Sequence, residues 1–445
     1  MREAVVLAAA SRLEKGEYSM LALIVSVLLI GLMILGVPVA ASMGITSLGI
    51  FAALGQGQYL AVMPQRIYVG ATSITMLAIP FFILAGNLMN TGGITDRIFN
   101  FARACCGHWP GGLGQVNILS SVIFSGMSGA AVADAAGLGA IEIKAMGDAG
   151  FDKRFSAGIT AASSTIGPVI PPSIPFVVYA SIIGASVGKL FMAGFIPGLL
   201  MAGAMSVAVY IISKRKHYPV EAKMPWKKRL VYFWKAIPSL MTVVLIIGGI
   251  WGGFFTATEA SVIASFYALI LGTLIYKEIT LKNLKKILTD SMLQSCMTLF
   301  IIAVANFLAY FLIHQRIPNM IITGLTTLTT NPTILILIII FILLILGCFV
   351  EGVAVILITT PIFMPVITSI GMDPVQFGVI MILASMIGLL TPPVGMSLYA
   401  VSSISGVSVV ELSKEVLPYV LGIFLVLLAI AFWPPLSMTL PNLLA

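Results

Sequence analysis

Long apolar segments alternate with short polar ones along almost the whole chain. Uninterrupted apolar runs occupy residues 190–213, 236–255, 333–350 and 413–433. Each run is close to the roughly 20 residues that a helix needs to cross the hydrocarbon core of a bilayer. Two further apolar segments are interrupted by Gly167-Pro-Val-Ile-Pro-Pro172 and Gly388-Leu-Leu-Thr-Pro-Pro393. Because proline breaks a helix and glycine weakens it, the pattern predicts membrane helices of which two are broken.

The two breaks belong to a longer pattern that occurs twice, 221 positions apart and without a gap. The first copy contains Gly126, Gly150, Asp152, Ser164, Ile166, Gly167, Pro171 and Pro172. The second copy contains Gly347, Gly371, Asp373, Ser385, Ile387, Gly388, Pro392 and Pro393. The alternative is two unrelated proline kinks, but a shared order of glycines and twin prolines is much harder to obtain by chance. Helices broken at corresponding places in two halves indicate the binding site of a transporter.

Residues 113–147 form a segment of unusual composition. They are rich in Gly, Ala and Ser and carry charged residues where a plain membrane span would carry leucine. Irregular backbone at membrane depth occurs only where protein or a water-filled cavity surrounds it. We therefore expect a re-entrant helical hairpin over 113–147 with its tip near Ser125–Gly129. An equivalent hairpin is expected over 333–368 with its tip at Gly347–Gly352.

These elements predict an all-α integral membrane protein made of two repeats. The expected organisation is an N-terminal extension (1–19), a first repeat (20–213) with a broken helix at 154–184, a basic cytoplasmic linker with a connecting helix pair (214–290), and a second repeat (291–445) with a broken helix at 374–407.

Composition and charge support the membrane assignment and exclude other classes. The chain is 59% hydrophobic and only 9% charged, whereas soluble domains carry about 25% charged residues. Eight of its Lys and Arg residues lie between 214 and 235 with Glu221 as the one acid. Short loops rich in Lys and Arg stay cytoplasmic, so this charge sets orientation in the lipid bilayer and does not indicate nucleic-acid binding. The four cysteines have no metal-ligand spacing, and the chain has only three histidines and no His-Glu-x-x-His motif of an enzyme.

The chemistry expected at the breaks is ion binding. A broken helix frees carbonyl oxygens, which suit a cation such as Na+ when a hydroxyl or two lie nearby, and its half-helix N-termini favour an anion. The candidate Na+ ligands of the first half are Ser125, Ser128, Gly167, Ile170 and Pro172. Those of the second half are Gly347, Gly388, Thr391 and Val394. The alternative is that these hydroxyls only satisfy freed backbone groups of their own helices.

Few polar residues are candidates for binding the solute. Arg66, Ser173 and Ser397 are the candidate substrate-binding residues, and Arg66 would equally serve as an interfacial anchor. Charged residues inside membrane segments are functional by default. For the five such residues, structural pairing and a role in transport remain equal alternatives: Asp134, Glu142, Lys144, Glu259 and Glu351.

Several motifs together resemble those of one family. They are Leu77-Ala-Ile-Pro-Phe-Phe-Ile-Leu-Ala-Gly86, Phe124-Ser-Gly-Met-Ser-Gly129, Ala131-Val-Ala-Asp134, Gly167-Pro-Val-Ile-Pro-Pro-Ser-Ile174 and Gly388-Leu-Leu-Thr-Pro-Pro-Val-Gly-Met396. Over residues 20–440 the chain resembles the large membrane subunit of tripartite ATP-independent periplasmic (TRAP) transporters. The resemblance implies two inverted repeats and an elevator motion of a transport part against a fixed scaffold. It also implies Na+-coupled uptake across the bacterial inner membrane.

The resemblance further implies two partners on separate chains, a small membrane subunit of four helices and a periplasmic solute-binding protein. It places two Na+ sites on the residues given above. The family often has a glycine in place of Ser164 and an aspartate in place of Glu351. The implied solute is an organic acid, with C4-dicarboxylates, sialic acid and keto acids fitting equally well. The alternative is a stand-alone Na+/dicarboxylate symporter, which shares the plan of hairpins and broken helices but needs no binding protein.

Overall fold

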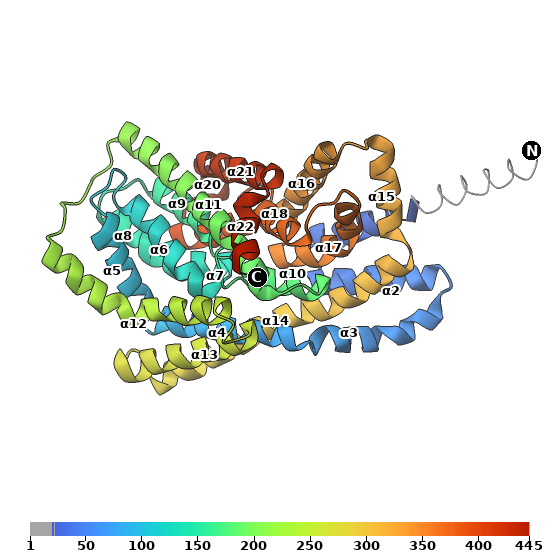
Figure 1. The fold of residues 1–445 in the computed structure, drawn as a ribbon, viewed down its shortest axis with the longest axis horizontal. Helices are drawn as coiled ribbons and strands as arrows, with labels where there is room; N and C mark the ends of the chain where they lie inside the picture. The colour runs from blue at the N-terminus through green and yellow to red at the C-terminus, as the bar shows by residue number, and fades with distance from the viewer. Residues whose placement is uncertain (1–19, 22, 445) are drawn as a thin grey trace, which may run out of the picture.

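The computed structural model describes residues 20–21 and 23–444, apart from the side chains of residues 126–128, 325, 326 and 328. All regular elements within these residues are helical (Figure 1). Seven helices are long and apolar enough to cross a membrane. The chain is therefore a multi-pass membrane protein, and the predicted extension at residues 1–19 lies outside the described residues.

The first half begins with a short apolar helix, Leu23–Ile34. It continues with α2 Val39–Ala53, α3 Met63–Ala71, α4 Ala78–Thr91, α5 Ile94–Cys106, α6 Leu113–Ser128, α7 Ala131–Ala136, α8 Leu138–Asp148, α9 Lys153–Ser164, α10 Ile174–Ile183 and α11 Val187–Lys216. Short 3-10 turns, Gly57–Val62 and Ile74–Leu77, precede α3 and α4.

The second half follows a connecting pair of helices. The pair is α12 Trp226–Trp251 and α13 Ala257–Ile270, which a π-helical turn, Leu271–Ile275, prolongs. The later helices are α14 Leu281–His314, α15 Ile317–Leu328, α16 Pro332–Phe349, α17 Gly352–Ser369, α18 Pro374–Gly388, α19 Met396–Ser405, α20 Val409–Glu415, α21 Leu417–Phe432 and α22 Pro435–Leu444.

The repeated Gly-x-Asp sequence starts equivalent helices in the two halves. Gly150 and Gly371 have φ values of +86° and +74°, a conformation that glycine adopts at little cost. Two residues later, the Asp152 carboxylate accepts a hydrogen bond from the backbone N–H of Arg154 at 2.8 Å. The Asp373 carboxylate does the same for Val375 at 2.7 Å. The repeat is thus conserved between halves because each copy turns the chain and caps a helix.

The helices form two groups (Figure 1). In the lower group α14 packs against α2, α3 and α4, and α13 packs against α4 and α12. In the upper group α18 packs against α16, α17, α11 and α21, while α6 packs against α9 and α11. Residues 155–180 and 376–390 are buried throughout. The first broken helix is therefore buried through its break, whereas the second is buried along α18 and exposed at Pro392 and Pro393 in its break.

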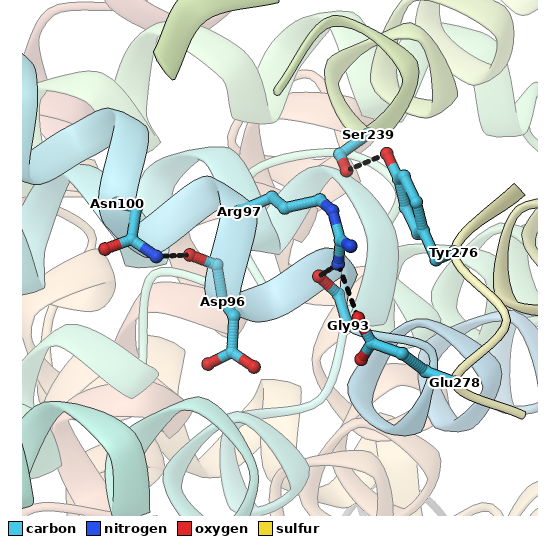
Figure 2. Close-up of polar contacts among 7 residues, drawn as sticks. All are labelled: Gly93, Asp96, Arg97, Asn100, Ser239, Tyr276 and Glu278. Atoms are coloured by element: carbon cyan, nitrogen blue, oxygen red, sulfur yellow. Dashed lines mark hydrogen bonds and ion pairs between the residues drawn. The ribbon is translucent and has the colours of Figure 1, made fainter. Parts of the chain in front are cut away.

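The helices that precede the two hairpins lie at opposite ends of the molecule, α5 at the left and α15 at the right of Figure 1. Helix α5 is clamped by Arg97, as Figure 2 shows. The Arg97 guanidinium donates to Gly93 O at 2.6 Å and Glu278 Oε1 at 2.9 Å, and lies 3.6 Å from the centre of the Tyr276 ring. Tyr276 in turn shares a hydrogen bond with Ser239 at 3.1 Å. This clamp ties α5 to the loop between α13 and α14.

Candidate ion and solute site

The first break is the stretch 165–173 between α9 and α10. Ser173 begins α10, because its Oγ accepts a hydrogen bond from the N–H of Phe176 at 3.2 Å and donates to Pro168 O. The hydroxyls of Ser164 and Thr165 donate to carbonyls one turn back in α9. Breaking the helix here leaves backbone groups of residues 165–173 without their usual helical partners inside a fully buried segment.

The second break is the stretch 389–395 between α18 and α19. Gly395 has a φ of +60°, and its N–H donates to Cys348 O of the hairpin at 3.2 Å. The hydroxyl of Thr391 donates to Ile387 O at 2.7 Å. The N–H of Ser397 reaches back across the break to Leu389 O at 3.2 Å.

Each hairpin contacts the broken helix of its own half. A Cβ atom on Gly129, at the turn after α6, would lie 2.6 Å from Pro172 O and 3.1 Å from Ile174 N. In the second half, a Cβ on Gly347 would lie 3.1 Å from the Cα of Gly388. The approach at Gly129 leaves no room for a Cβ atom, and neither does that at Gly388, whose Cβ would lie 2.7 Å from Gly347 O, which explains why glycine stands at these two positions.

Among the candidate Na+ ligands of the first half, Pro172 takes part in the contact with Gly129. Ser125 is fully buried and donates its hydroxyl hydrogen to Val122 O at 2.6 Å, which leaves its oxygen free to accept or to bind a cation. Gly167, Ile170 and Pro172 lie in the first break, and the side chain of Ser128 lies outside the described residues.

In the second half, Gly347 and Gly388 are in direct contact, and Thr391 and Val394 follow in the break. The described residues contain no group of three or more His, Cys, Asp or Glu side chains that could hold a metal ion. Carbonyl and hydroxyl oxygens, which suit Na+, are therefore the ligands that these two places offer.

Two buried acids lie on the second arm of the first hairpin, Asp134 on α7 and Glu142 on α8. Asp134 is 3% and Glu142 is 1% exposed. A Cβ atom added to Gly167 would overlap with Asp134 Oδ2. A carboxylate oxygen is therefore in contact with one of the candidate ligands. Glu142 Oε1 is buried and has no hydrogen-bond partner among the described residues. The sequence left the role of Asp134 open, and only the fold brings it to Gly167.

Glu351 has a different position. Its carboxylate accepts hydrogen bonds from the N–H groups of Val353 at 3.0 Å and Ala354 at 3.3 Å. It therefore caps the N-terminus of α17 at the tip of the second hairpin, which is the favourable place for an acid next to a helix dipole.

The three candidate substrate residues are not brought together. Ser173 and Ser397 are fully buried at the starts of α10 and α19, and the Oγ of Ser397 has no partner among the described residues. Arg66 lies on α3, where its guanidinium carbon stands 4.5 Å from the centre of the Tyr310 ring. That contact matches the anchoring alternative for Arg66.

A cleft of about 800 Å³ opens between the lower group and the ends of α10 and α17. Its polar lining comes from Ser73, Ser181, Asn306, Arg316, Asn319 and Thr360. Of the described residues that line it, Arg316 is the one with a charge, and it occupies the turn between α14 and α15 with a φ of +55°. The sequence analysis missed Arg316, whose signal was a lone cation between two apolar segments.

A helical membrane protein with two internally broken helices, each contacted by a hairpin and set beside a polar cleft, has the features of a secondary transporter. Residues 26–436 match the family described as the tripartite ATP-independent periplasmic transporter, DctM component. The chain belongs to this family of transporter permeases, as its motifs predicted, and is not an enzyme.

Named relatives agree with this assignment, and one solved structure shows a similar fold. The chain is 42% identical to the sialic acid TRAP transporter large permease protein SiaM of Vibrio cholerae, covering 93% of this chain and 97% of that protein. It is 35% identical to the C4-dicarboxylate TRAP transporter large permease protein DctM of Rhodobacter capsulatus, covering 96% and 100%. The crystal structure of the Alcanivorax borkumensis YdaH transporter has a similar fold, with a TM-score of 0.61, 13% identity and coverage of 86% and 90%.

Proposed function

We propose that the chain takes up an organic acid across the bacterial inner membrane by coupling its entry to a Na+ gradient. The observation that carries the proposal is the contact between each hairpin and the broken helix of its own half, at Gly129 with Pro172 and at Gly347 with Gly388. Freed carbonyls and buried hydroxyls meet at these contacts, as a cation site requires. Two such places support at least two Na+ sites, formed by Ser125, Ser128, Gly167, Ile170 and Pro172, and by Gly347, Gly388, Thr391 and Val394.

The solute is proposed to bind as an anion. Both named relatives carry acids, a sialic acid and C4-dicarboxylates. The cleft offers Arg316 and several hydroxyl and amide groups to a carboxylate, and the guanidinium group suits carboxylates because it can donate two parallel hydrogen bonds. The N-termini of α10 and α19 at the two breaks add the positive ends of helix dipoles.

An elevator motion is the proposed route across the membrane. The upper group contains both breaks and both hairpins, and the lower group lies across the cleft from α10 and α17. The opposite positions of α5 and α15 support two inverted repeats (Figure 1). In this proposal α5 and α15 link the fixed lower group to the hairpins, and the upper group moves as one body.

The family implies a small four-helix membrane subunit and a periplasmic binding protein as partners, and the experiment that tests the proposal includes both. Proteoliposomes would contain this chain with its small subunit, and uptake of a sialic acid, a C4-dicarboxylate and a keto acid would be measured with Na+ or choline outside. We expect uptake only with an inward Na+ gradient and only with the binding protein. Na+-driven uptake without the binding protein would instead establish the stand-alone symporter, and uptake indifferent to Na+ would refute the coupling.

A further inference from the structure

An open apolar groove runs along the outer side of the upper group, between α11 and α21. These helices pack side by side in Figure 1. The groove has a volume of about 720 Å³ and extends from Leu200 to Arg215 on α11 and from Pro418 to Trp433 on α21. It lies apart from both breaks and from the polar cleft, and neither the ion sites nor the solute site uses it.

The groove exists because small residues face each other between larger ones. A Cβ on Gly422 of α21 would lie 3.2 Å from the Cβ of Ala204 on α11, so the two backbones approach closely, as small residues allow in membranes. The larger side chains on either side remain 45–59% exposed, and they are Val207, Ile211, Leu421 and Leu425. The groove therefore has an apolar floor and apolar walls.

One end of the groove is cationic. Arg215 is the one charged residue among the described residues that line it, with Lys214 and Lys216 as chain neighbours. The acid closest to the start of α21 along the chain is Glu415. Its carboxylate pairs with the Lys216 ammonium at 3.4 Å. Arg215 has no ion-pair partner within the described part of the chain. This end adjoins the basic segment 214–235, which the distribution of Lys and Arg places on the cytoplasmic side.

We propose that this groove binds an anionic phospholipid of the cytoplasmic leaflet, with an acyl chain along Ala204 and Gly422 and the phosphate at Arg215. From Leu200 to Arg215 a helix rises about 22 Å, which exceeds the depth of one leaflet, about 15 Å, so a whole chain fits. A protein helix of that length and about 10 Å across would occupy more than twice the volume of the groove, so the groove is too small to hold a helix. The Arg215 guanidinium, which has no ion-pair partner within the described part of the chain, favours a lipid whose headgroup has a net negative charge. Anionic lipids concentrate near cationic side chains at this surface.

The binding test uses the full chain with its small subunit, without solute or Na+, so that its outcome is independent of the transport proposal. The complex is exchanged into detergent with phosphatidylglycerol or phosphatidylethanolamine of identical acyl chains, and retained lipid is counted by native mass spectrometry. We expect one retained phosphatidylglycerol, at least tenfold preferred over phosphatidylethanolamine. Arg215→Gln should abolish the preference, Arg215→Lys should keep most of it, and Lys227→Gln, outside the groove, should leave it unchanged.

A second variant tests the acyl-chain part of the site. Gly422→Leu, which places a side chain into the groove, should reduce retention of both lipids, and an unchanged size-exclusion profile would show that it folds. Equal retention of the two lipids by the native chain, or unchanged retention in Gly422→Leu, would overturn the proposal. A disulfide or crosslink from Val207→Cys to the small subunit or to a second copy would overturn it too, because a protein would then cover the groove.

Discussion

The two units, each a hairpin followed by a broken helix, share the order of these parts along the chain but differ in the side chains that hold them together. In the first unit, α6 and α9 are joined by polar side chains, since Asn117 donates to Thr160 Oγ1 at 2.7 Å and accepts from Ser163 at 2.6 Å. In the second unit, α16 and α18 meet through the backbones of Gly347 and Gly388. The glycines and prolines common to both units thus determine where the helices break, and the residues that differ determine how each unit is held together.

The units also differ in charge. The first has two buried acids in its hairpin, and one of them, Asp134, touches Gly167 in the break. The second has Glu351, whose carboxylate is occupied by the N–H groups of its own helix. A cation in the first unit would therefore have a carboxylate as neighbour, whereas one in the second would depend more on neutral oxygens. The two sites are expected to differ in affinity.

The largest effect is expected from Gly388→Ala, which attacks the glycine contact of the second unit. The new methyl would lie 2.7 Å from Gly347 O and closer still to other backbone atoms of that residue. Because two helix backbones must separate, we expect a loss of about 1–3 kcal/mol in unfolding free energy and loss of most uptake. Thermal unfolding in detergent and proteoliposome uptake measure the two effects.

Two further substitutions make this test specific to the comparison. Gly167→Ala meets Asp134 Oδ2, the end of a rotatable side chain, and is expected to cost less stability than Gly388→Ala. Gly203→Ala on α11 has no heavy atom within 4 Å and serves as the neutral control. If Gly388→Ala lowered the unfolding free energy as little as Gly203→Ala, α16 and α18 would not be in close contact at Gly388.

The next effect concerns the polar joint of the first unit. Asn117→Ala removes the hydrogen-bond donor to the buried Thr160 hydroxyl and one of the two acceptors of Ser163, which keeps Thr160 O at 3.2 Å, and an unsatisfied buried polar group costs about 1–3 kcal/mol. We expect about 2 kcal/mol of destabilisation. In the second unit, Thr360 donates to Ile356 O of its own helix at 2.6 Å, so Thr360→Val should cost much less. Equal losses in thermal unfolding would show that the units do not differ in this way.

A smaller effect, on ion binding alone, distinguishes the two proposed Na+ sites. Thr391→Val should raise the Na+ concentration for half-maximal uptake about tenfold, equivalent to about 1.4 kcal/mol. Ser125→Ala should raise it less, because the Asp134 carboxylate remains beside the first site. Neither change should lower thermal stability by much, since both hydroxyls donate within their own helices.

The control for these ion-site variants is Ser47→Ala on α2. Ser47 is fully buried and donates to Met43 O at 2.8 Å, a hydrogen bond of the same kind. Uptake by this variant should keep the native Na+ dependence. An unchanged Na+ dependence in both Ser125→Ala and Thr391→Val would mean that these hydroxyls only satisfy local backbone groups.

Local patterns predicted the features that each segment dictates by itself. Apolar runs predicted membrane helices, and motifs in their order predicted the family, which the comparisons confirm. The breaks could be placed from Gly-x-x-x-Pro-Pro because glycine and proline act on the backbone of their own segment. The hairpins' depth in the membrane, the Na+ ligands and the elevator motion stay predictions.

Local patterns could not predict the contacts between segments that are distant along the chain. Arg316 joins residues from α3, α10 and α17 at one cleft, and no spacing along the chain reports this. Asp134 meets Gly167, 33 positions away, only because α6 to α8 fold back onto the break. The sequence contained these residues as lone charges in apolar surroundings, a signal that marks them as important without indicating their neighbours.

The smallest effect is expected at the helices that lead into the two units. Helix α5 of the first unit is clamped by Arg97 and Glu278, whose side chains are 28% and 41% exposed (Figure 2). Helix α15 of the second starts beside a neutral pair, Gln315 to Gln56 at 2.6 Å. A double-mutant cycle of Arg97→Gln and Glu278→Gln should give a coupling of about 0.5–1 kcal/mol, because partial burial adds to a surface ion pair. Tyr276, beneath the guanidinium, adds a cation–π contribution that Arg97→Gln removes and Glu278→Gln leaves in place.

The matched control for that cycle is the ion pair of Arg154 and Glu411, which is as short, at 2.6 Å, but more exposed on its arginine side at 60%. Its coupling should be close to zero, since exposed pairs gain little over hydration. Arg97→Gln should therefore lose more stability than Glu278→Gln, and salt should weaken the ion pair while leaving the contact with Tyr276 largely intact. Equal couplings for the two pairs would show that α5 is held by packing alone, and the charged clamp would then no longer separate the first unit from the second.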